Sequence, residues 1–353
     1  MRFNGPHSQL IVKVNDMKRF IKKVVVTIGL MIIAVGVFFA GGIAYKQNQY
    51  QKIPWATHLL NLLEQTHFYP APHQDNVPIF EAKELTYPYS FVVYGDSREL
   101  AFYEKTALIS NVITEKPSFV IHLGDMVYCG DPHQWENFDF SDGNIIKSGI
   151  PLFPVLGNHE YRSQKEWYPP NPEKQLQYYF DRFKFLKNKR WYSFTYGNSL
   201  FLILDTNTDY SPGSEQHRWL MDMLKKNSSR FLFVAFHHPP YSKGYHTRDA
   251  EKALAQILEK GPVKPDIVFS GHQHNYERYH YNGIHYIVSG GGGTEQGPVE
   301  RAPKDFYNQP GDTFHYCKIT LSETTAHFKM IKLEKVTGTW QVADTFTISK
   351  PTP

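Results

Sequence analysis

Six residues with oxygen or imidazole side chains stand at the ends of short apolar runs in this 353-residue sequence. They are Asp96, Asp125, Asn158, His237, His272 and His274. A single Gly-Asp pair after an apolar run is usually a turn, and a single histidine such as His237 could equally pack in a core. The repetition of donor residues after five separate runs instead indicates one shared site.

These six residues offer two carboxylates, one amide and three imidazoles, and they include no thiolate. Such donors suit iron, manganese or zinc in a catalytic site better than zinc in a structural site. His272 and His274 are two residues apart, so in extended backbone their side chains project to the same side. Each can then reach one ion of a pair about 3.5–4 Å apart, which a carboxylate bridges. The sequence therefore predicts a two-metal hydrolase.

Strands that alternate with helices must position these residues. The apolar runs are 90–96, 118–125, 151–158, 200–206, 231–238 and 266–274. Their length and their content of Val, Ile, Phe and Leu are typical of strands buried on both faces. The donors follow these runs, and ligands bind at the carboxyl ends of strands in open α/β sheets.

The segments between these runs predict helices and one hairpin. Helices are expected at 101–116, at 215–226 behind Ser214 as N-cap, and at 247–260 before a Gly-Pro stop. Residues 191–196 and 199–205 are expected to pair as a hairpin. The end of the chain is strand-like throughout. The fold class predicted is mixed α/β with covered sheets and an antiparallel closing portion.

The ordered motifs resemble the calcineurin-like metallophosphoesterase superfamily. The matching blocks are Gly95-Asp96-Ser97-Arg98, Gly124-Asp125-Met126-Val127-Tyr128, Gly157-Asn158-His159-Glu160, Val234-Ala235-Phe236-His237 and Gly271-His272-Gln273-His274. Most branches of the superfamily have Asp-x-His in the first block, whereas this chain has Arg98 at the histidine position. It has Tyr128 three residues after Asp125, which is the pattern of the purple acid phosphatases. The resemblance covers about residues 89–348.

This resemblance implies a four-layer sandwich of two mixed β-sheets flanked by helices, and a binuclear centre of Fe(III) with Fe(II), Zn(II) or Mn(II). The first metal would be held by Asp96, Asp125, Tyr128 and His274. The second would be held by Asp125 as a bridge, Asn158, His237 and His272. His159 and His246 match histidines that contact the substrate phosphoryl group.

Two departures from the family pattern bear on substrate and architecture. Thr247 stands where the plant enzymes have a second histidine. The N-terminal β-sandwich domain of those enzymes, of about 100 residues, does not fit within residues 46–88.

The resemblance implies hydrolysis of small phosphomonoesters by a hydroxide activated at the two metals. One alternative keeps the metals and changes the substrate to phosphodiesters or nucleoside pyrophosphates, a choice that loops such as 160–190 would decide. Another alternative is a membrane-tethered binding module with an inactive site. Its signature would be lost ligands, and every ligand type is present.

The N-terminal residues predict export from the cytoplasm. Residues 1–23 contain six basic residues and one acidic residue, so the net charge of +4 lies in this tail and the rest is nearly neutral. A nearly neutral body is not expected to bind nucleic acid. Residues 24–45 carry no charge and are long enough to span a bilayer. The basic flank favours a cytoplasmic tail and an extracytoplasmic body, periplasmic or at the cell surface.

Residues 24–45 fit a membrane anchor, and a cleaved signal peptide remains the alternative. Residues 46–88 are expected to be a linker with one short helix at 55–68, and 89–350 to be the catalytic domain. Cys129 and Cys317 could pair in an exported protein, although nothing in the sequence brings them together.

Overall fold

The computed structural model describes residues 86–98, 102–166, 169, 171–245, 251–310 and 313–351. The predicted basic tail 1–23, the membrane segment 24–45 and the helix at 55–68 therefore lie outside the described residues. Among the helices that are described, none combines the length and the apolar character that crossing a membrane requires.

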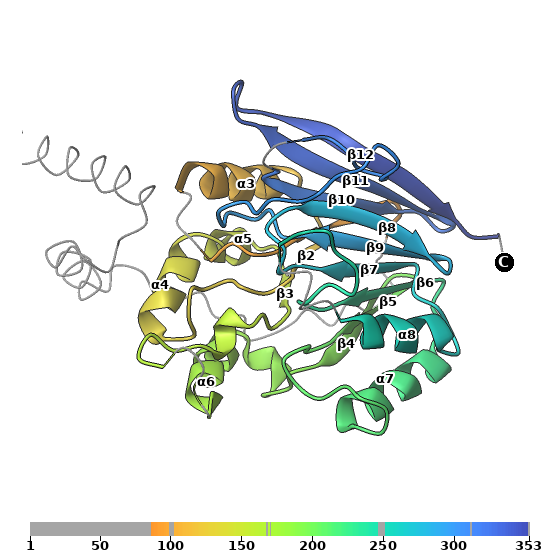
Figure 1. Ribbon diagram of the computed structural model, residues 1–353, viewed down its shortest axis with the longest axis horizontal. Helices are drawn as coiled ribbons and strands as arrows, with labels where there is room; N and C mark the ends of the chain where they lie inside the picture. Colours follow the sequence, from red (N-terminus) through yellow and green to blue (C-terminus); the bar gives the residue numbers. More distant parts are fainter. Residues whose placement is uncertain are drawn as a thin grey trace, which may run out of the picture. The chain divides into compact units, whose positions relative to one another are not determined.

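The first sheet has six strands in the order β12-β11-β10-β1-β2-β3 (Figure 1). Its strands are β1 (Tyr89–Tyr94), β2 (Phe119–His122), β3 (Leu152–Pro154), β10 (His315–Leu321), β11 (Thr325–Glu334) and β12 (Thr339–Ser349). Strands β1, β2 and β3 run parallel. The last three strands pair antiparallel, which confirms the predicted antiparallel closing portion.

The second sheet has six strands in the order β4-β5-β6-β7-β9-β8. Its strands are β4 (Tyr192–Tyr196), β5 (Ser199–Ile203), β6 (Phe231–Ala235), β7 (Ile267–Ser270), β8 (Tyr276–Tyr281) and β9 (Ile284–Ser289). Strands β5, β6, β7 and β9 are parallel. The predicted hairpin is β4 with β5, and its turn contains Gly197 with a φ of 57°.

Aromatic side chains fill the space between the two sheets. The Phe91 ring of β1 stacks on Phe119 of β2, with 5.1 Å between centroids, and meets Phe201 of β5 edge-on at 5.1 Å. Phe201 in turn stacks on Phe233 of β6 at 5.0 Å. Because each of these rings buries about 150–250 Å², this layer fixes the position of one sheet against the other.

Helices cover the outer faces of both sheets, which completes the four-layer sandwich (Figure 1). Helices α3 (Phe102–Thr114) and α5 (Gly143–Lys147) pack on the first sheet. Helices α7 (Glu215–Lys226) and α8 (Lys252–Lys260) pack on the second. The Ser214 side chain accepts a hydrogen bond from the His217 N–H at 3.2 Å, so the predicted N-cap of α7 is confirmed.

Further helices carry a separate apolar cluster beside the first sheet. They are α4 (Pro132–Phe140), η3 (His159–Tyr161), α6 (Glu173–Arg182) and η4 (Lys184–Leu186). The sequence did not predict them.

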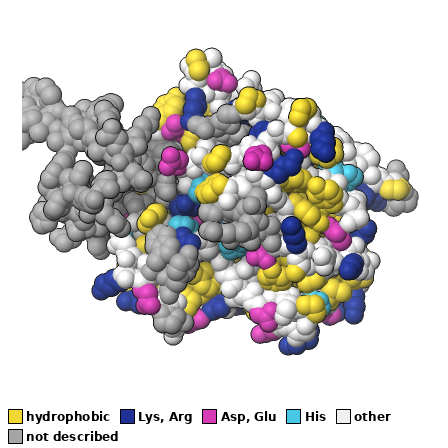
Figure 2. Space-filling model, viewed as in Figure 1, with side chains coloured by type: hydrophobic (Ala, Val, Ile, Leu, Met, Phe, Trp, Pro, Cys, Tyr) yellow, Lys and Arg dark blue, Asp and Glu magenta, His cyan; other side chains and the backbone are white. Residues whose placement is uncertain are grey.

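The helix predicted at 247–260 corresponds to α8, which begins at Lys252 behind Glu251, and residues 246–250 lie outside the described part. The disulfide that the sequence left open is not formed: Cys129 and Cys317 are both buried free thiols. On the face shown in Figure 2, basic side chains are dispersed among acidic and apolar ones, in keeping with the nearly neutral composition of the body.

Candidate metal centre

Five parallel strands from both sheets end at the edge where the predicted donors lie. Asp96, Asp125 and Asn158 follow β1, β2 and β3, whereas His237 follows β6 and both His272 and His274 follow β7. The structure thus brings together the six donors that the apolar runs predicted.

Three of these donors have backbone conformations that are unusual for their residue type. The φ angles of Asp96, Asp125 and His272 are 59°, 54° and 67°. These values lie in the left-handed region, which residues other than glycine adopt only in a few per cent of cases. Each such residue costs about 1–3 kcal/mol and persists only where the surroundings enforce it. Three of the seven described non-glycine residues with positive φ lie at this edge, which supports a functional role for it.

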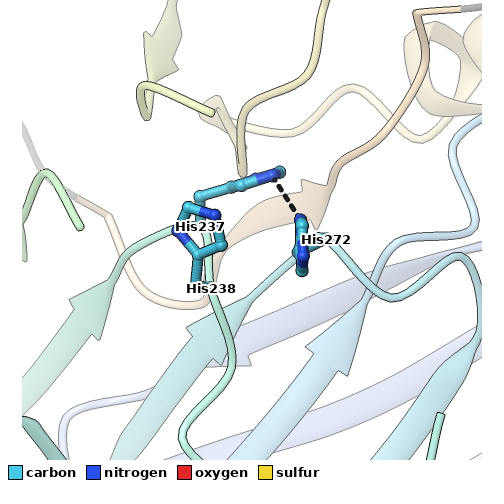
Figure 3. Close-up of side chains that lie close together, drawn as sticks. All are labelled: His237, His238 and His272. Atoms are coloured by element: carbon cyan, nitrogen blue, oxygen red, sulfur yellow. Dashed lines mark hydrogen bonds between the residues drawn. The ribbon is translucent and has the colours of Figure 1, made fainter. Parts of the chain in front are cut away.

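Three donor atoms converge on one point between the sheets. Asn158 Oδ1 lies 3.0 Å from His237 Nε2 and 3.1 Å from His272 Nδ1. His237 Nε2 is 3.3 Å from His272 Nδ1 (Figure 3), and Asp125 Oδ1 lies 3.3 Å from His237 Nε2. Ligands bound at about 2.0–2.2 Å from one zinc-like ion are separated by about 3.0–3.5 Å. Asn158, His237 and His272 of the set proposed for the second metal therefore have the spacing of ligands to one ion.

The opposite nitrogen of His237 fixes the direction of its ring. His237 Nδ1 lies 2.8 Å from the Leu123 carbonyl oxygen, so the Nδ1–H donates to that oxygen and Nε2 is the nitrogen that faces the other donors. Metal-binding histidines characteristically have such a partner on the far nitrogen.

Arg98 occupies part of the position proposed for the first metal. Its Nη1 lies 2.9 Å from Asp125 Oδ2 and 2.9 Å from His274 Nε2, while His274 Nε2 lies 3.7 Å from Asp96 Oδ1. A guanidinium has no lone pair and cannot ligate a metal. The first set therefore has suitable donors, but an ion can take Asp125 Oδ2 and His274 Nε2 only if Arg98 moves aside.

Tyr128 and His159 lie together at the rim of the centre. The Tyr128 side chain is 38% exposed, and its ring centroid is 5.8 Å from that of His159. His159 Nδ1 lies 2.6 Å from the Tyr128 carbonyl oxygen and donates to it. The Nε2 of the neutral ring then accepts from Arg162 Nη1. His246 lies outside the described residues.

The ionisable groups at the centre shift one another's pKa values. Burial raises the pKa of Asp96 to about 7, and the Asp125 charge adds to the rise, although His237 and Arg98 oppose it. Burial alone would lower the pKa of His237, but the carboxylates of Asp125 and Asp96 raise it to about 9. Burial would raise the pKa of Asp125, yet His159, His237 and Arg98 hold it well below its usual range. Asp125 is thus the ionised carboxylate that His237 and Arg98 share.

Glu160 is a residue of the centre whose role the sequence did not reveal. Its side chain is fully buried and accepts three backbone N–H bonds, from Asp125 at 3.0 Å, Met126 at 2.8 Å and Gly157 at 2.7 Å. Glu160 therefore joins the loop of Asp125 to the loop of Asn158. Its place in the Gly157–Glu160 block was the only signal, and that block does not show which backbone groups it binds.

Two glycines are required for close approach at the centre. A Cβ at Gly157 would lie 2.3 Å from Asp125 Oδ1, and one at Gly271 would lie 2.5 Å from Asp96 Oδ2. A side chain at either position would displace a donor oxygen.

Comparison with known proteins gives consistent matches over this part of the chain. The sequence model of the calcineurin-like phosphoesterases matches residues 89–276, a range that contains all six converging donors. The chain is 30% identical over 256 residues to purple acid phosphatase 15 of Arabidopsis thaliana, covering 60% of this chain and 46% of that protein. It is 27% identical over 279 residues to probable inactive purple acid phosphatase 24 of the same plant, covering 65% of this chain and 43% of that protein.

A solved purple acid phosphatase from yellow lupin (Lupinus luteus) seeds shares the fold. Its TM-score is 0.56 at 23% identity, covering 75% of this chain and 54% of that chain. The chain spans about half the length of the curated relatives it matches.

Replacing Glu160 by glutamine should weaken metal binding, although the two side chains have nearly the same size. One accepting oxygen becomes an N–H₂ group that faces backbone donors, which should lower the free energy of unfolding by about 1–3 kcal/mol. Because both ligand loops loosen, zinc affinity measured by calorimetry should fall about tenfold.

Asp266→Asn is the matched control for this substitution. Asp266 also accepts a backbone N–H, from Leu232 at 2.9 Å, but it precedes β7 and lies at the opposite end of that strand from His272. It should lower stability and leave zinc affinity unchanged. Equal zinc affinities in Glu160→Gln and the wild type would show that Glu160 does not position the ligands.

Proposed function

Because this chain belongs to the calcineurin-like phosphoesterase family, we propose that it hydrolyses phosphomonoesters at a binuclear metal centre of purple acid phosphatase type. The observation that supports the proposal best is the convergence of Asn158, His237 and His272, whose donor atoms lie 3.0–3.3 Å from one another, with Asp125 Oδ1 3.3 Å from His237 Nε2. These residues come from two different sheets, so their convergence is not a consequence of neighbouring positions in the chain.

Two sets of side chains would hold the metals. The first set is Asp96, Asp125, Tyr128 and His274, and the second is Asp125, Asn158, His237 and His272. Fe(III) in the first position with Fe(II), Zn(II) or Mn(II) in the second matches these oxygen and nitrogen donors. When bound, such a pair of ions clamps phosphoryl oxygens and makes hydroxide available for in-line attack.

The protein's own residues would orient and neutralise the phosphoryl group. His159 holds Arg162 at the rim of the centre, where a guanidinium is suited to bind phosphate oxygens in a bidentate manner. We assign His159 and His246 to contact with the substrate, and His246 to proton transfer toward the leaving oxygen. Arg98, once displaced from Asp125 and His274, would add a second guanidinium.

An inactive binding module is the less favoured reading, although one similar protein is named as probably inactive. Loss of activity in a two-metal hydrolase follows most directly from loss of a ligand. This chain retains all the carboxylate, amide and imidazole ligands, and six of them lie together at the sheet edge.

We further propose that the enzyme acts outside the cytoplasm on small phosphorylated compounds. The support is the charge pattern of residues 1–45, with a basic tail before an uncharged segment. Residues 24–45 would serve either as the membrane anchor or as a cleaved signal peptide.

The experiment that tests the function compares two chromogenic substrates on metal-loaded protein. p-Nitrophenyl phosphate should be hydrolysed with a kcat/KM at least about tenfold above that for bis-p-nitrophenyl phosphate, and chelation should abolish both activities. A preference for the diester would favour the phosphodiesterase alternative. Absence of both activities in protein that carries two ions would contradict a phosphoesterase function.

Tyr128→Phe tests the assignment to the purple acid phosphatase type. A phenol with a pKa of about 10 is deprotonated at neutral pH only beside a strong Lewis acid. If Tyr128 ligates Fe(III), the iron-loaded wild type should show a visible charge-transfer band and a pink to purple colour. Tyr128→Phe keeps the ring and removes only the oxygen, so the band should disappear and kcat should fall sharply.

Tyr245→Phe is the matched control. The Tyr245 hydroxyl lies 3.2 Å from His274 Nδ1, so it is close to the centre but contacts the ring nitrogen of His274 that is not the proposed metal ligand. It should keep the colour. A Tyr128→Phe protein with an unchanged absorption spectrum would exclude this tyrosine as the ligand and leave the broader phosphoesterase proposal intact.

A further inference from the structure

His238 is a third imidazole beside the second metal position. It follows His237 directly after β6, and its ring centroid is 4.5 Å from that of His272 and 5.0 Å from that of His237. One ring nitrogen from each of the three histidines lies within 4.8 Å of the other two (Figure 3). His237 and His272 are buried, whereas His238 is only partly buried, so a molecule arriving from solvent can reach its ring.

The hydroxyl of Thr206 holds the His238 ring. Thr206 Oγ1 accepts the backbone N–H of His238 at 3.2 Å and lies 2.8 Å from His238 Nδ1. A hydroxyl accepts up to two hydrogen bonds and donates one, so Thr206 can donate its proton to Nδ1 while it accepts the backbone N–H. With Thr206 as this donor, the hydrogen of the neutral ring is on Nε2.

An imidazole whose Nε2 carries a hydrogen is a donor and not a metal ligand. This separates His238 from its neighbour His237, because the Nδ1–H of His237 donates to Leu123 and its Nε2 faces the shared donor cluster. His238 thus adds an N–H group at the border of this cluster.

We propose that His238, held by Thr206, binds a phosphoryl oxygen of the substrate on the side of the second metal. The N–H group is fixed in direction before the substrate arrives, and a hydrogen bond to an anionic oxygen is stronger than one between neutral groups. Thr206 acts as a positioning residue through His238. This inference rests on the proposed phosphoesterase function and assigns one more substrate contact to the same site.

Binding of inorganic phosphate to the zinc-loaded protein tests this role by calorimetry, independently of turnover. His238→Leu should weaken phosphate binding at least about tenfold. His238→Gln, which restores an N–H donor at a similar reach, should recover most of the affinity. Thr206→Val should weaken binding severalfold, and Thr206→Ser should bind as the wild type does. Metal content measured by elemental analysis should be the same in all four variants.

His327→Leu is the matched control, because His327 Nδ1 also lies 2.9 Å from a threonine hydroxyl, that of Thr347. His327 pairs with Thr320, which pairs with Ser90 at the start of β1, so it lies at the opposite end of that sheet from Asp96. Its substitution should leave phosphate affinity unchanged.

Three results would overturn the inference. They are unchanged phosphate affinity in His238→Leu, loss of a metal ion from that variant, and absence of phosphate binding by the zinc-loaded wild type. A wild type that binds phosphate but hydrolyses no phosphoester would contradict the proposed function, and the His238 series would still decide whether this residue binds the phosphoryl group.

Discussion

The aromatic contact between the two sheets is the interaction on which the metal centre depends. Asp125 and Asn158 belong to the first sheet, whereas His237 and His272 belong to the second. Nevertheless, Asn158, His237 and His272 have donor atoms 3.0–3.3 Å apart, and Asp125 Oδ1 lies 3.3 Å from His237 Nε2. The rings of Phe91, Phe119, Phe201 and Phe233 hold the sheets in this relation, and dense packing allows little sliding. The aromatic core thus determines the geometry of the candidate site, although its rings supply none of the donor atoms.

Charge then determines how the centre can be occupied. Asp125 is the carboxylate that His237 and Arg98 both approach, so an added metal cation competes with a positive charge that is already present. The proposed second metal position has three donors arranged around one point, while the proposed first position shares Asp125 Oδ2 and His274 Nε2 with Arg98. This asymmetry predicts different metal affinities for the two positions. It follows from arginine at position 98, where most branches of the superfamily have histidine.

Local sequence was sufficient for the strands other than β8 and β9, and for the donors that follow the parallel strands, because a short apolar run ending in a polar residue is a local pattern. The hairpin was predictable for the same reason, since Gly197 adopts the positive φ of its turn. Helices α4 and α6 were not, because their apolar residues pack against each other and against the first sheet over long distances in the sequence. The contacts of Glu160, Arg98 and Thr206 could not be predicted from the sequence either, because each contact joins segments that only the folded chain brings together.

The number of ions that the centre binds tests its two-metal character most directly. Calorimetric titration of the metal-stripped protein should show two ions per chain, one bound tightly at the position of Asn158, His237 and His272, and one bound more weakly where Arg98 must move. Saturation at a single ion per chain, with Asp125 and His274 still bonded to Arg98, would contradict a binuclear centre.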